Sequence, residues 1–422
     1  MINTKIKNWG LLFFLLFTIF LTLNRHSKSD VQNYHSEIWA DKAGYYIYLP
    51  ALFIYDFKSE KLPSDIDKKT GFGFHVENGK IITKYTYGVA LMQSPFFITY
   101  YGISKLFGFN DDGFSLLHHK IIDITAVFYS FFALIFLYLF LIRHLSKKES
   151  AFTVICLYLG TNIFYYSIFE TGMSHIYSFF LFTTLLYLGS FLTNKGRRIH
   201  YILFGFIVGL ILAVRPFNVI FLPVYFILNS FNLSNIQRNI KNYILAIITV
   251  IFVVIPQLIY WKYAYGNYLH YSYEGESFSN VLHPKLIHLW FSTNNGLFIY
   301  NPIIIFTLIG LYYYYKEARK YSIVIGAYFL FISFVFSTWH DWGYGCSYGC
   351  RPYVEYYSIF ALPFGFFMRK LIINNSYRLV LLSLLVVSII YNQKLLFSFD
   401  GCWYGGIWDW SALIELVLGP TK

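Results

Sequence analysis

Long, uninterrupted runs of apolar residues dominate the chain and predict helices rather than strands. Residues 11–23 read LLFFLLFTIFLTL, and residues 124–142 read ITAVFYSFFALIFLYLFLI. The strands of a transmembrane barrel alternate apolar and polar positions, whereas a spanning helix needs roughly 20 consecutive apolar residues. The pattern therefore predicts an all-α fold, a polytopic helical membrane protein with about 11 transmembrane helices.

The first predicted span covers residues 9–23 and follows Lys5 and Lys7, which places its N-terminus in the cytosol. The next residues, NRHSKSD (24–30), offer no small-residue cleavage site, so we expect an uncleaved helix. The later predicted spans are 114–142, 151–169, 174–193, 201–214, 216–230, 243–263, 286–314, 321–338, 353–368 and 377–391.

Two segments decide the orientation. Residues 87–109 contain several polar positions and Pro95, so we expect an interfacial helix in the first outer loop rather than a span. Residues 201–229 are too long for one span and hold Arg215 and Pro216 at their middle. An arginine at the bilayer centre costs about 3 kcal/mol or more, and proline breaks a helix. We expect two short helices that meet near the outer face, with Arg215 at the tip.

Composition excludes the soluble classes. Hydrophobic residues make up 57% of the 422 positions and charged residues only 13%, whereas a soluble domain has about a quarter charged residues. The formal net charge of +12 fits basic cytosolic turns and contact with anionic membrane lipid. We expect no nucleic-acid partner, because no basic stripe is long or amphipathic.

Acidic residues separate the two predicted sides of the membrane. Of the 21 Asp and Glu residues, only Glu149 and Glu317 fall in predicted cytosolic loops. We therefore expect a transmembrane domain over residues 1–391, with the outer loop 24–113, and an external tail over 392–422. Any chemistry is expected on the external face of the plasma (inner) membrane.

Cysteines and short motifs narrow the chemistry further. Cys156, Cys346, Cys350 and Cys402 form no CxxC pair, and a disulfide among the last three, in predicted outer loops, is permitted but not implied. The chain has no P-loop, GxSxG or HExxH motif. This disfavours an ATP-driven pump and a serine esterase.

The stretch EIWADKAGYYIYLPALF (37–53) holds the first candidate residues. Asp41, close to the membrane interface, can act as a general base toward a hydroxyl group. Tyr45 and Tyr46 can hydrogen-bond a sugar and lie flat at the interface. The alternative is a solvated loop acid beside an aromatic belt.

A second candidate group opens the helix predicted over 114–142. His118, His119 and Lys120 stand at its outer end, with Asp123 one turn deeper. Ionisable residues inside a membrane are candidates for function. The alternative is an interfacial cap in which Lys120 extends its ammonium group to the surface.

Two further candidates lie in outer turns. Glu170 and His175 flank Gly172 in ETGMSHIY and could hold a metal or position an acceptor, although two residues are too few for a metal site. Arg215 requires an anion at its depth, which is a lipid phosphate, a substrate phosphate or a protein carboxylate.

The loop WHDWGYGCSYGCRPYVEYY (339–357) is the last candidate. Trp339 and Trp342 can stack on a sugar ring, and Arg351 can bind phosphate bidentately. The alternative is a tight aromatic turn with an Arg351–Glu355 ion pair at i,i+4.

Taken together, these segments resemble the GT-C superfamily of integral membrane glycosyltransferases, which use polyprenyl-phosphate sugars. The group includes protein O-mannosyltransferases and the aminoarabinose transferases of lipid A. DKAGYYIYLPALF resembles the conserved acid and its following tyrosine, YGVALMQSPFFITYYGISKLFGF a proline-containing surface segment, LAVRPFNVIFLP an LxRP helix break, and WGYGCSYGCRPY a glycine-rich outer loop with arginine. The likeness covers most of residues 1–370.

The resemblance implies roles for individual residues. Asp41 would be the catalytic base that takes the proton of the acceptor hydroxyl. Arg215 and Arg351, together with Lys84 or Lys120, would hold the lipid phosphate and stabilise it as a leaving group. The implied partners are a polyprenyl-phosphate sugar donor and a glycan, lipid or protein acceptor, and the reaction would invert the anomeric carbon.

The chain departs from the pattern at the second outer loop, where many relatives carry another Asp. Glu170 lies upstream of that position and Ser174 and His175 lie near it, so Glu170 is the candidate second carboxylate. No cofactor is assigned, and a divalent metal is left open. Many relatives also have a large soluble C-terminal domain, so acceptor recognition is expected from the membrane part or from a partner.

Two other classes compete with a glycosyltransferase. One is a polymerase or a transporter or flippase of lipid-linked glycans, and the other is a structural membrane protein. A transporter should carry polar residues at mid-membrane in several helices, whereas here they crowd the outer ends. A polymerase would use the same kinds of residue, and the sequence does not separate it from the transferase.

Overall fold

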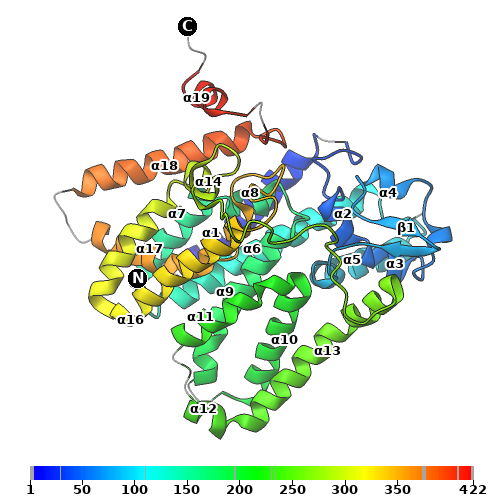
Figure 1. The fold of residues 1–422 in the computed structure, drawn as a ribbon, viewed down its shortest axis with the longest axis horizontal. Helices are drawn as coiled ribbons and strands as arrows, with labels where there is room; N and C mark the ends of the chain where they lie inside the picture. Colours follow the sequence, from blue (N-terminus) through cyan, green and yellow to red (C-terminus); the bar gives the residue numbers. More distant parts are fainter. Residues whose placement is uncertain are drawn as a thin grey trace.

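The structure, a computed structural model, describes residues 4–28, 30–109, 111–193, 196–229, 231, 233–372, 377–405 and 408–419 (Figure 1). The first part of the chain forms α1 (Thr4–His26), α2 (Asp41–Tyr46), α3 (Tyr48–Phe53), η1 (Ser59–Lys61), α4 (Ile66–Lys69), β1 (His75–Glu77), β2 (Lys80–Ile82) and α5 (Gly88–Leu106). The middle forms α6 (Leu116–Leu141), α7 (Lys147–Gly160), α8 (Ile163–Ile168), α9 (Ser174–Thr193), α10 (Arg198–Val214), η2 (Pro216–Ile220), α11 (Phe221–Leu228) and α12 (Leu233–Arg238). The last part forms α13 (Ile240–Tyr265), α14 (Leu286–Phe291), α15 (Leu297–Tyr300), α16 (Ile304–Ser337), η3 (Arg351–Tyr353), α17 (Tyr357–Ile372), α18 (Arg378–Ser398) and α19 (Trp410–Leu418).

Six helices in the described part of the chain are long and apolar enough to cross a membrane: Trp9–His26, Leu116–Leu141, Ser174–Leu192, Ile240–Tyr265, Ile304–Ser337 and Arg378–Ser398. Two shorter apolar helices are Arg198–Val214 and Pro216–Leu228. The multi-pass helical class is therefore confirmed. The full number of about 11 spans stays a prediction.

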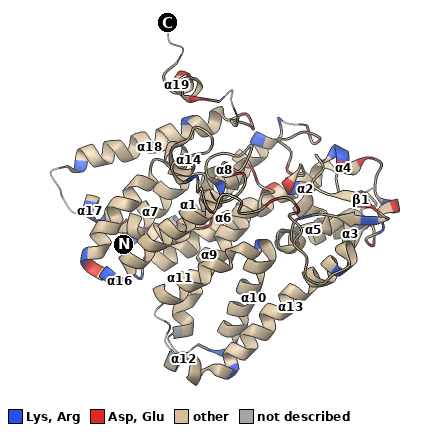
Figure 2. Ribbon diagram, in the orientation of Figure 1, with Lys and Arg blue, Asp and Glu red and all other residues tan. Residues whose placement is uncertain are grey.

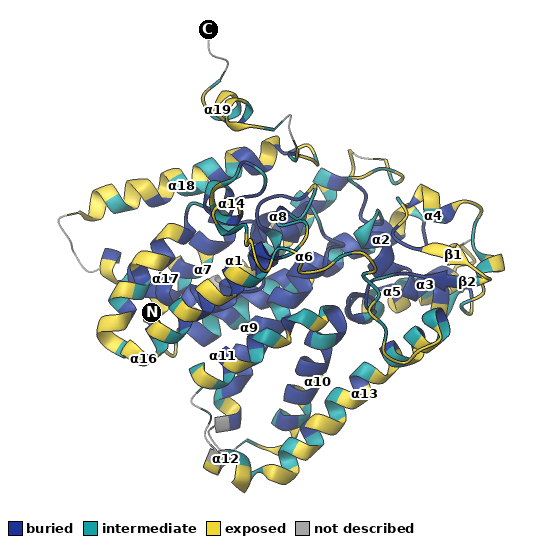
Figure 3. Ribbon diagram, viewed as in Figure 1, coloured by how far each residue is buried: buried dark blue, intermediate teal, exposed yellow. Residues whose placement is uncertain are grey.

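The helices form one bundle around a core rich in aromatic side chains. Helix α6 packs against α9 and α1, α10 packs against α13, and α16 packs against α17. Figure 3 shows α6 and α9 largely buried and α13 and α18 exposed along one side. The exposed side of α13 is apolar, with Ile247, Phe252 and Ile259 all more than half exposed. Water would penalise such a surface, whereas lipid would not.

The strictly all-α expectation is wrong for one short segment. Strands β1 and β2 pair antiparallel with Glu77 opposite Lys80, so the turn consists of Asn78 and Gly79. Both turn residues have positive φ, 50° and 75°, which is the geometry of a type I′ hairpin turn. The sequence HVENGKII (75–82) carries the Asn-Gly signal for this hairpin.

Two predicted spans are broken. Residues 286–314 divide into α14, α15 and the start of α16, because Asn295 adopts a left-handed φ of 62° and Pro302 follows the end of α15. Residues 151–169 divide between α7 and α8 at Thr161.

Within α16 the backbone is non-helical at Ala318, and the Ser322 hydroxyl donates to the Leu311 carbonyl at 2.7 Å. The two limbs of α16 therefore lie side by side, with the predicted turn between them.

The predicted helix break at Arg215 and Pro216 is present. Arg215 ends α10 with extended φ and ψ of −151° and 102°, as expected for a residue that precedes proline. The predicted surface helix over 87–109 is α5, which packs against α6, α10 and α2. A Cβ atom on Gly88 would lie 2.3 Å from the Ala213 backbone, so α5 begins directly against the break.

Charged residues gather at the ends of the helices, and the middle of the bundle is almost free of them (Figure 2).

Helix α18 continues to Ser398, so the tail that we expected from residue 392 begins at Phe399. Within the described residues, Cys346 and Cys402 form a disulfide, while Cys156 and Cys350 are free and buried. The disulfide ties this tail to the loop before η3.

The close contact between α10 and α13 gives a stability prediction. A Cβ atom on Gly205 would lie 2.2 Å from the Ala246 carbonyl oxygen, and a backbone atom in a packed helix has little room to yield. Overpacking typically costs roughly 1–3 kcal/mol, so Gly205→Ala should lower the unfolding temperature in detergent. Gly102→Ala is the matched control, because nothing lies within 4 Å of its Cβ position. Equal melting temperatures for the two variants would contradict this packing.

Candidate active site

A cavity of about 860 Å³ lies among α2, the start of α9, the α10–η2 break and the loop before α17. It is lined by eight of the predicted site residues: Asp41, Tyr45, Lys84, Glu170, His175, Arg215, Trp339 and Arg351. These residues lie far apart in sequence. The fold, rather than any local motif, assembles the cavity.

Asp41 is the first residue of α2 and is only partly buried. The Tyr85 hydroxyl donates to its Oδ1, and Arg351 Nη1 lies 3.5 Å from its Oδ2. Burial raises the pKa of Asp41, but the Arg351 guanidinium, the Tyr85 hydroxyl and two lysine ammonium groups nearby outweigh burial and hold this pKa below its ordinary value. Asp41 is therefore a carboxylate at neutral pH, able to accept a hydrogen bond or a proton.

Close backbone packing fixes the position of Asp41. Ala40, the residue before it, has a positive φ of 48°, which is unfavourable for a residue with a side chain. A Cβ atom on Gly73 would lie 1.9 Å from the Ala40 carbonyl oxygen, and one on Gly44 would lie 2.2 Å from the Tyr85 ring. Glycine at both positions lets the two segments approach closely enough for Tyr85 to reach Asp41.

Arg215 finds a protein carboxylate. Its Nη1 lies 3.2 Å from Glu355 Oε1, and His175 Nδ1 lies 3.0 Å from Glu355 Oε2. Glu355 is almost fully buried, whereas about a quarter of the Arg215 side chain is exposed. The expected alternative, an Arg351–Glu355 pair, is not what forms, because the 3-10 turn η3 directs Arg351 to Asp41 instead.

The other cavity cations are also paired. Lys42 Nζ lies 2.8 Å from Glu170 Oε2, so Glu170 and His175 have different partners and do not form one site. Lys84 Nζ lies 2.5 Å from Glu276 Oε1. Glu276 belongs to the loop between α13 and α14, and the pair holds this loop over the cavity.

Aromatic rings form much of the cavity wall. Trp339 packs edge-on against Phe278 with ring centroids 5.0 Å apart, and Tyr273 also lines the cavity. Trp342 lies beside His288 and is not among the lining residues. Of the two predicted sugar-stacking tryptophans, only Trp339 is thus in place.

Tyr46 and Lys120 lie outside the cavity, and we no longer assign them to a substrate. The Tyr46 hydroxyl donates to the Gly113 carbonyl at 2.6 Å within a buried cluster. The Lys120 ammonium points inward to Glu37 and Asp123, at 3.0 and 3.5 Å. Lys120 therefore does not extend to the membrane surface either, because two buried carboxylates attract it.

A second cavity of about 720 Å³ adjoins the first. It is lined by the β1–β2 hairpin, by the end of α13 at Ala264 and by the loops around Gly71 and Ser272. Asp41, Lys84 and Tyr85 line both cavities. Asp41 thus lies where the two cavities meet.

Sequence reasoning missed Lys42, Tyr85 and Glu276 as parts of the site, and it considered Glu355 as a partner of Arg351 rather than of Arg215. Lys42 follows Asp41 directly and Tyr85 follows Lys84, so adjacency to a candidate residue was a usable signal for these two. Nothing in the sequence around Glu276 marks its pairing with a lysine 192 positions away.

No protein-family model and no curated protein sequence matches the chain. Two solved structures of an oligosaccharyltransferase from Archaeoglobus fulgidus are similar in fold. One, tethered with an acceptor peptide containing the NVT sequon, has a TM-score of 0.48 and 10% identity, over 93% of this chain and 55% of that chain. The other, AglB in complex with an inhibitory peptide and a dolichol-phosphate, has a TM-score of 0.47 and 12% identity, over 95% and 56%. The chain thus spans about half the length of these structures.

The buried Glu355 pair should matter more for stability than the exposed Glu276 pair. Removing one partner of a buried ion pair costs about 3–5 kcal/mol. Because Arg215 is partly exposed, we expect Glu355→Gln to cost somewhat less, about 2–3 kcal/mol. Glu276→Gln is the matched control, because partly exposed pairs contribute roughly 0–1 kcal/mol. Chemical denaturation in detergent compares them. A smaller loss in Glu355→Gln than in Glu276→Gln would show that Glu355 is not the anchor of Arg215.

Proposed function

We propose that this chain is a membrane glycosyltransferase that moves a sugar from a polyprenyl-phosphate donor to an acceptor hydroxyl, on the outer face of the membrane. The observation that carries the proposal is the position of Asp41. An ionised carboxylate stands between a cavity with two arginines and aromatic walls and a second cavity of its own.

The larger cavity suits the donor. Arg351 and Arg215 both line it, with about a quarter of each side chain exposed. Guanidinium groups bind phosphate bidentately and stabilise the charge that a departing phosphate gains. Trp339 and Tyr273 supply flat apolar faces for a sugar ring.

The smaller cavity suits the acceptor. A hydroxyl entering from the hairpin side would reach Asp41 through a cavity whose described lining includes no arginine. Asp41 takes the hydroxyl proton while the acceptor oxygen bonds to the anomeric carbon, and the bond between that carbon and the phosphate oxygen breaks. Attack opposite the leaving phosphate inverts the anomeric carbon.

Donor binding would also strengthen the base. Arg351 is the foremost of the charges that lower the pKa of Asp41. A donor phosphate that draws Arg351 away would let this pKa rise, because burial would then be less opposed. Asp41 would become a better proton acceptor only when the donor is in place.

Glu170 is proposed as a supporting carboxylate rather than a second base. Lys42 Nζ lies 2.8 Å from it, as Arg351 lies beside Asp41. Basic side chains already balance Asp41 and Glu170, so we propose that these cations, rather than a bound divalent metal, neutralise the charge that develops. His175, held by Glu355, would orient Arg215.

The direct test uses purified protein in detergent and a panel of radiolabelled polyprenyl-phosphate monosaccharides. Cleavage of the sugar–phosphate bond is expected with one sugar, and Asp41→Asn should reduce it at least about 100-fold, the range for a general base. Asp56→Asn is the matched control, since Asp56 lies in the same loop and pairs only with exposed Lys61. No cleavage with any sugar by folded protein would favour a polymerase, transporter or flippase of lipid-linked glycans.

The pH dependence gives a second test. The Tyr85 hydrogen bond lowers the pKa of Asp41, so Tyr85→Phe should raise it. Activity that needs ionised Asp41 is lost as the pH falls through this pKa. The acid limb of kcat/KM should therefore move to higher pH in Tyr85→Phe. Tyr101→Phe is the control, because the Tyr101 hydroxyl donates only to the Phe53 carbonyl at 3.0 Å. An acid limb that stays in place would remove Asp41 as the titrating base.

A further inference from the structure

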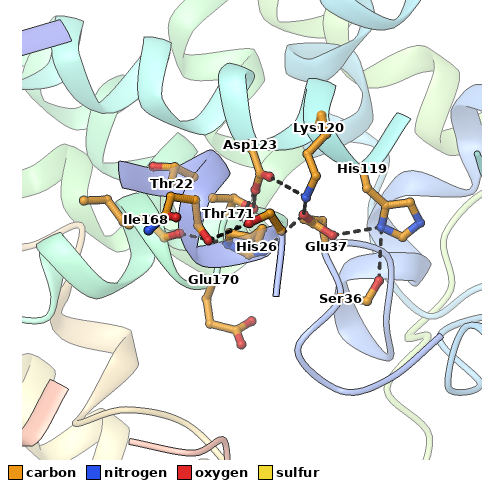
Figure 4. Close-up of polar contacts among 12 residues, drawn as sticks. Thr22, His26, Ser36, Glu37, His119, Lys120, Asp123, Ile168, Glu170 and Thr171 are labelled. Carbon is orange, nitrogen blue, oxygen red and sulfur yellow. Dashed lines mark hydrogen bonds and ion pairs between the residues drawn. The ribbon is translucent and has the colours of Figure 1, made fainter. Parts of the chain in front are cut away.

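A buried ionic cluster lies behind the larger cavity, and no step of the proposed transfer uses it (Figure 4). It joins the end of α1, the loop before α2, the start of α6 and the turn between α8 and α9. We call these side chains the ionic cluster: His26, Glu37, His119, Lys120, Asp123 and Thr171.

Glu37 is the centre of the cluster. His26 Nδ1 lies 3.1 Å from its Oε1, Lys120 Nζ donates to the same oxygen at 3.0 Å, and His119 Nδ1 lies 2.9 Å from Oε2. Burial raises the pKa of Glu37, but these hydrogen bonds more than offset burial and hold it below its ordinary value. Glu37 is therefore an ionised carboxylate surrounded by donors.

Asp123 is the second carboxylate and is fully buried on α6. The Thr171 hydroxyl donates to its Oδ1 at 2.9 Å. Lys120 Nζ lies 3.5 Å from its Oδ2, and His26 Nε2 lies 3.5 Å from its Oδ1. Asp123 thus connects α6 to the turn that carries Thr171.

His26 connects α1 to two other parts of the chain through its ring nitrogens. Its Nδ1 lies 3.1 Å from Glu37 Oε1, and its Nε2 lies 2.9 Å from the Ile168 carbonyl oxygen. A carbonyl oxygen only accepts hydrogen bonds, so Nε2 carries a proton and donates. The end of α1 is therefore held to both the loop before α2 and the end of α8.

The contacts of the cluster argue for a cross-link rather than a metal site. His26, Glu37 and Asp123 can bring ligand atoms within 4.8 Å of one another. A metal ligand must offer a lone pair, yet His26 Nε2 donates to the Ile168 carbonyl. The Lys120 ammonium already holds Glu37 Oε1, and the Thr171 hydroxyl holds Asp123 Oδ1.

The cross-link joins the two segments that carry Asp41 and Glu170. Glu37 precedes Asp41 by four positions, and Thr171 directly follows Glu170. A Cβ atom on Gly172 would lie 2.5 Å from the Glu37 carbonyl oxygen, so the loops touch. Figure 4 shows Glu170 pointing away from the cluster.

We propose that Glu37 and Asp123 are positioning residues that hold Asp41 and Glu170 at their working separation. Neither residue lines the cavity. The proposal rests on the proposed function, since it assigns these residues to the same transfer. A displacement of even about 1 Å at a reacting group can cost about 100-fold in rate, which is why such a cross-link would matter.

The Thr171–Asp123 hydrogen bond offers a nearly isosteric test. Thr171→Val removes the hydroxyl that reaches Asp123, and Thr171→Ser keeps it. Thr125→Val is the matched control, because Thr125 is a fully buried threonine on α6 whose hydroxyl donates only to the Ile121 carbonyl. Single-turnover and steady-state cleavage of the labelled donor measure kcat and KM, and thermal unfolding checks the fold.

We expect Thr171→Val to lower kcat by roughly 10- to 100-fold, with the donor KM within about three-fold, because Arg351 and Arg215 are untouched. Thr171→Ser and Thr125→Val should behave like the unmodified chain. An equal loss in Thr125→Val, or a raised KM at unchanged kcat, would overturn the positioning role. A metal response would also overturn the positioning role. The contradicting result is that EDTA inactivates the unmodified chain, that Mn²⁺ restores its activity, and that Thr171→Val no longer responds to either.

A readout without activity keeps this proposal separate from the proposed function. Hydrogen–deuterium exchange should be faster in residues 36–44 and 168–173 of Thr171→Val than in Thr125→Val, because a lost cross-link loosens both loops. Equal exchange in the two variants would overturn the cross-link even if no donor is cleaved. If Thr171→Val exchanges faster but the unmodified chain cleaves no donor, the cross-link is confirmed and only the transferase function is rejected.

Discussion

The ion pair between Asp41 and Arg351 joins the start of α2 to the turn before α17, across 310 positions of sequence. It follows from the constraint on which the site depends: charged groups at the edge of an apolar bundle are costly unless they are compensated. The same constraint explains the neighbouring pairs, in which Arg215, Lys42 and Lys84 each meet a carboxylate. Charge compensation, more than contact between adjacent residues, fixes how the loops fold onto the helices.

These pairs also prepare the site for an anionic ligand. Glu355 is buried and anchors Arg215 from behind, while the guanidinium remains partly exposed to the cavity. Arg351 is held less tightly, since 3.5 Å separates it from Asp41. A phosphate could therefore draw Arg351 from Asp41 without dismantling the framework. The disulfide between Cys346 and Cys402 restrains the loop that carries Arg351.

The sequence was most informative where one residue imposes its own geometry. Arg215 before Pro216 predicted the helix break, and the apolar runs predicted six helices long enough to span a membrane. The sequence was least informative about which charged side chains pair with one another. An i,i+4 spacing suggested Arg351 with Glu355, but a 3-10 turn and the distant Asp41 decide that contact. Lys120 looked like a surface cation because the two carboxylates that draw it inward are visible only in the fold. The hairpin carries a recognisable Asn-Gly signal at positions 78 and 79. Its two strands have only three residues each, too few to stand out beside the long apolar runs.

The central claim is that Asp41 stands between a donor phosphate held by Arg351 and an acceptor entering from the hairpin side. The most direct test is a cryo-EM structure of Asp41→Asn with an intact donor bound, namely the polyprenyl-phosphate sugar that the unmodified protein cleaves. We predict phosphate density against Arg351 and Arg215, and the anomeric carbon facing position 41. Phosphate density bound elsewhere, or a sugar whose anomeric carbon faces away from position 41, would contradict the account.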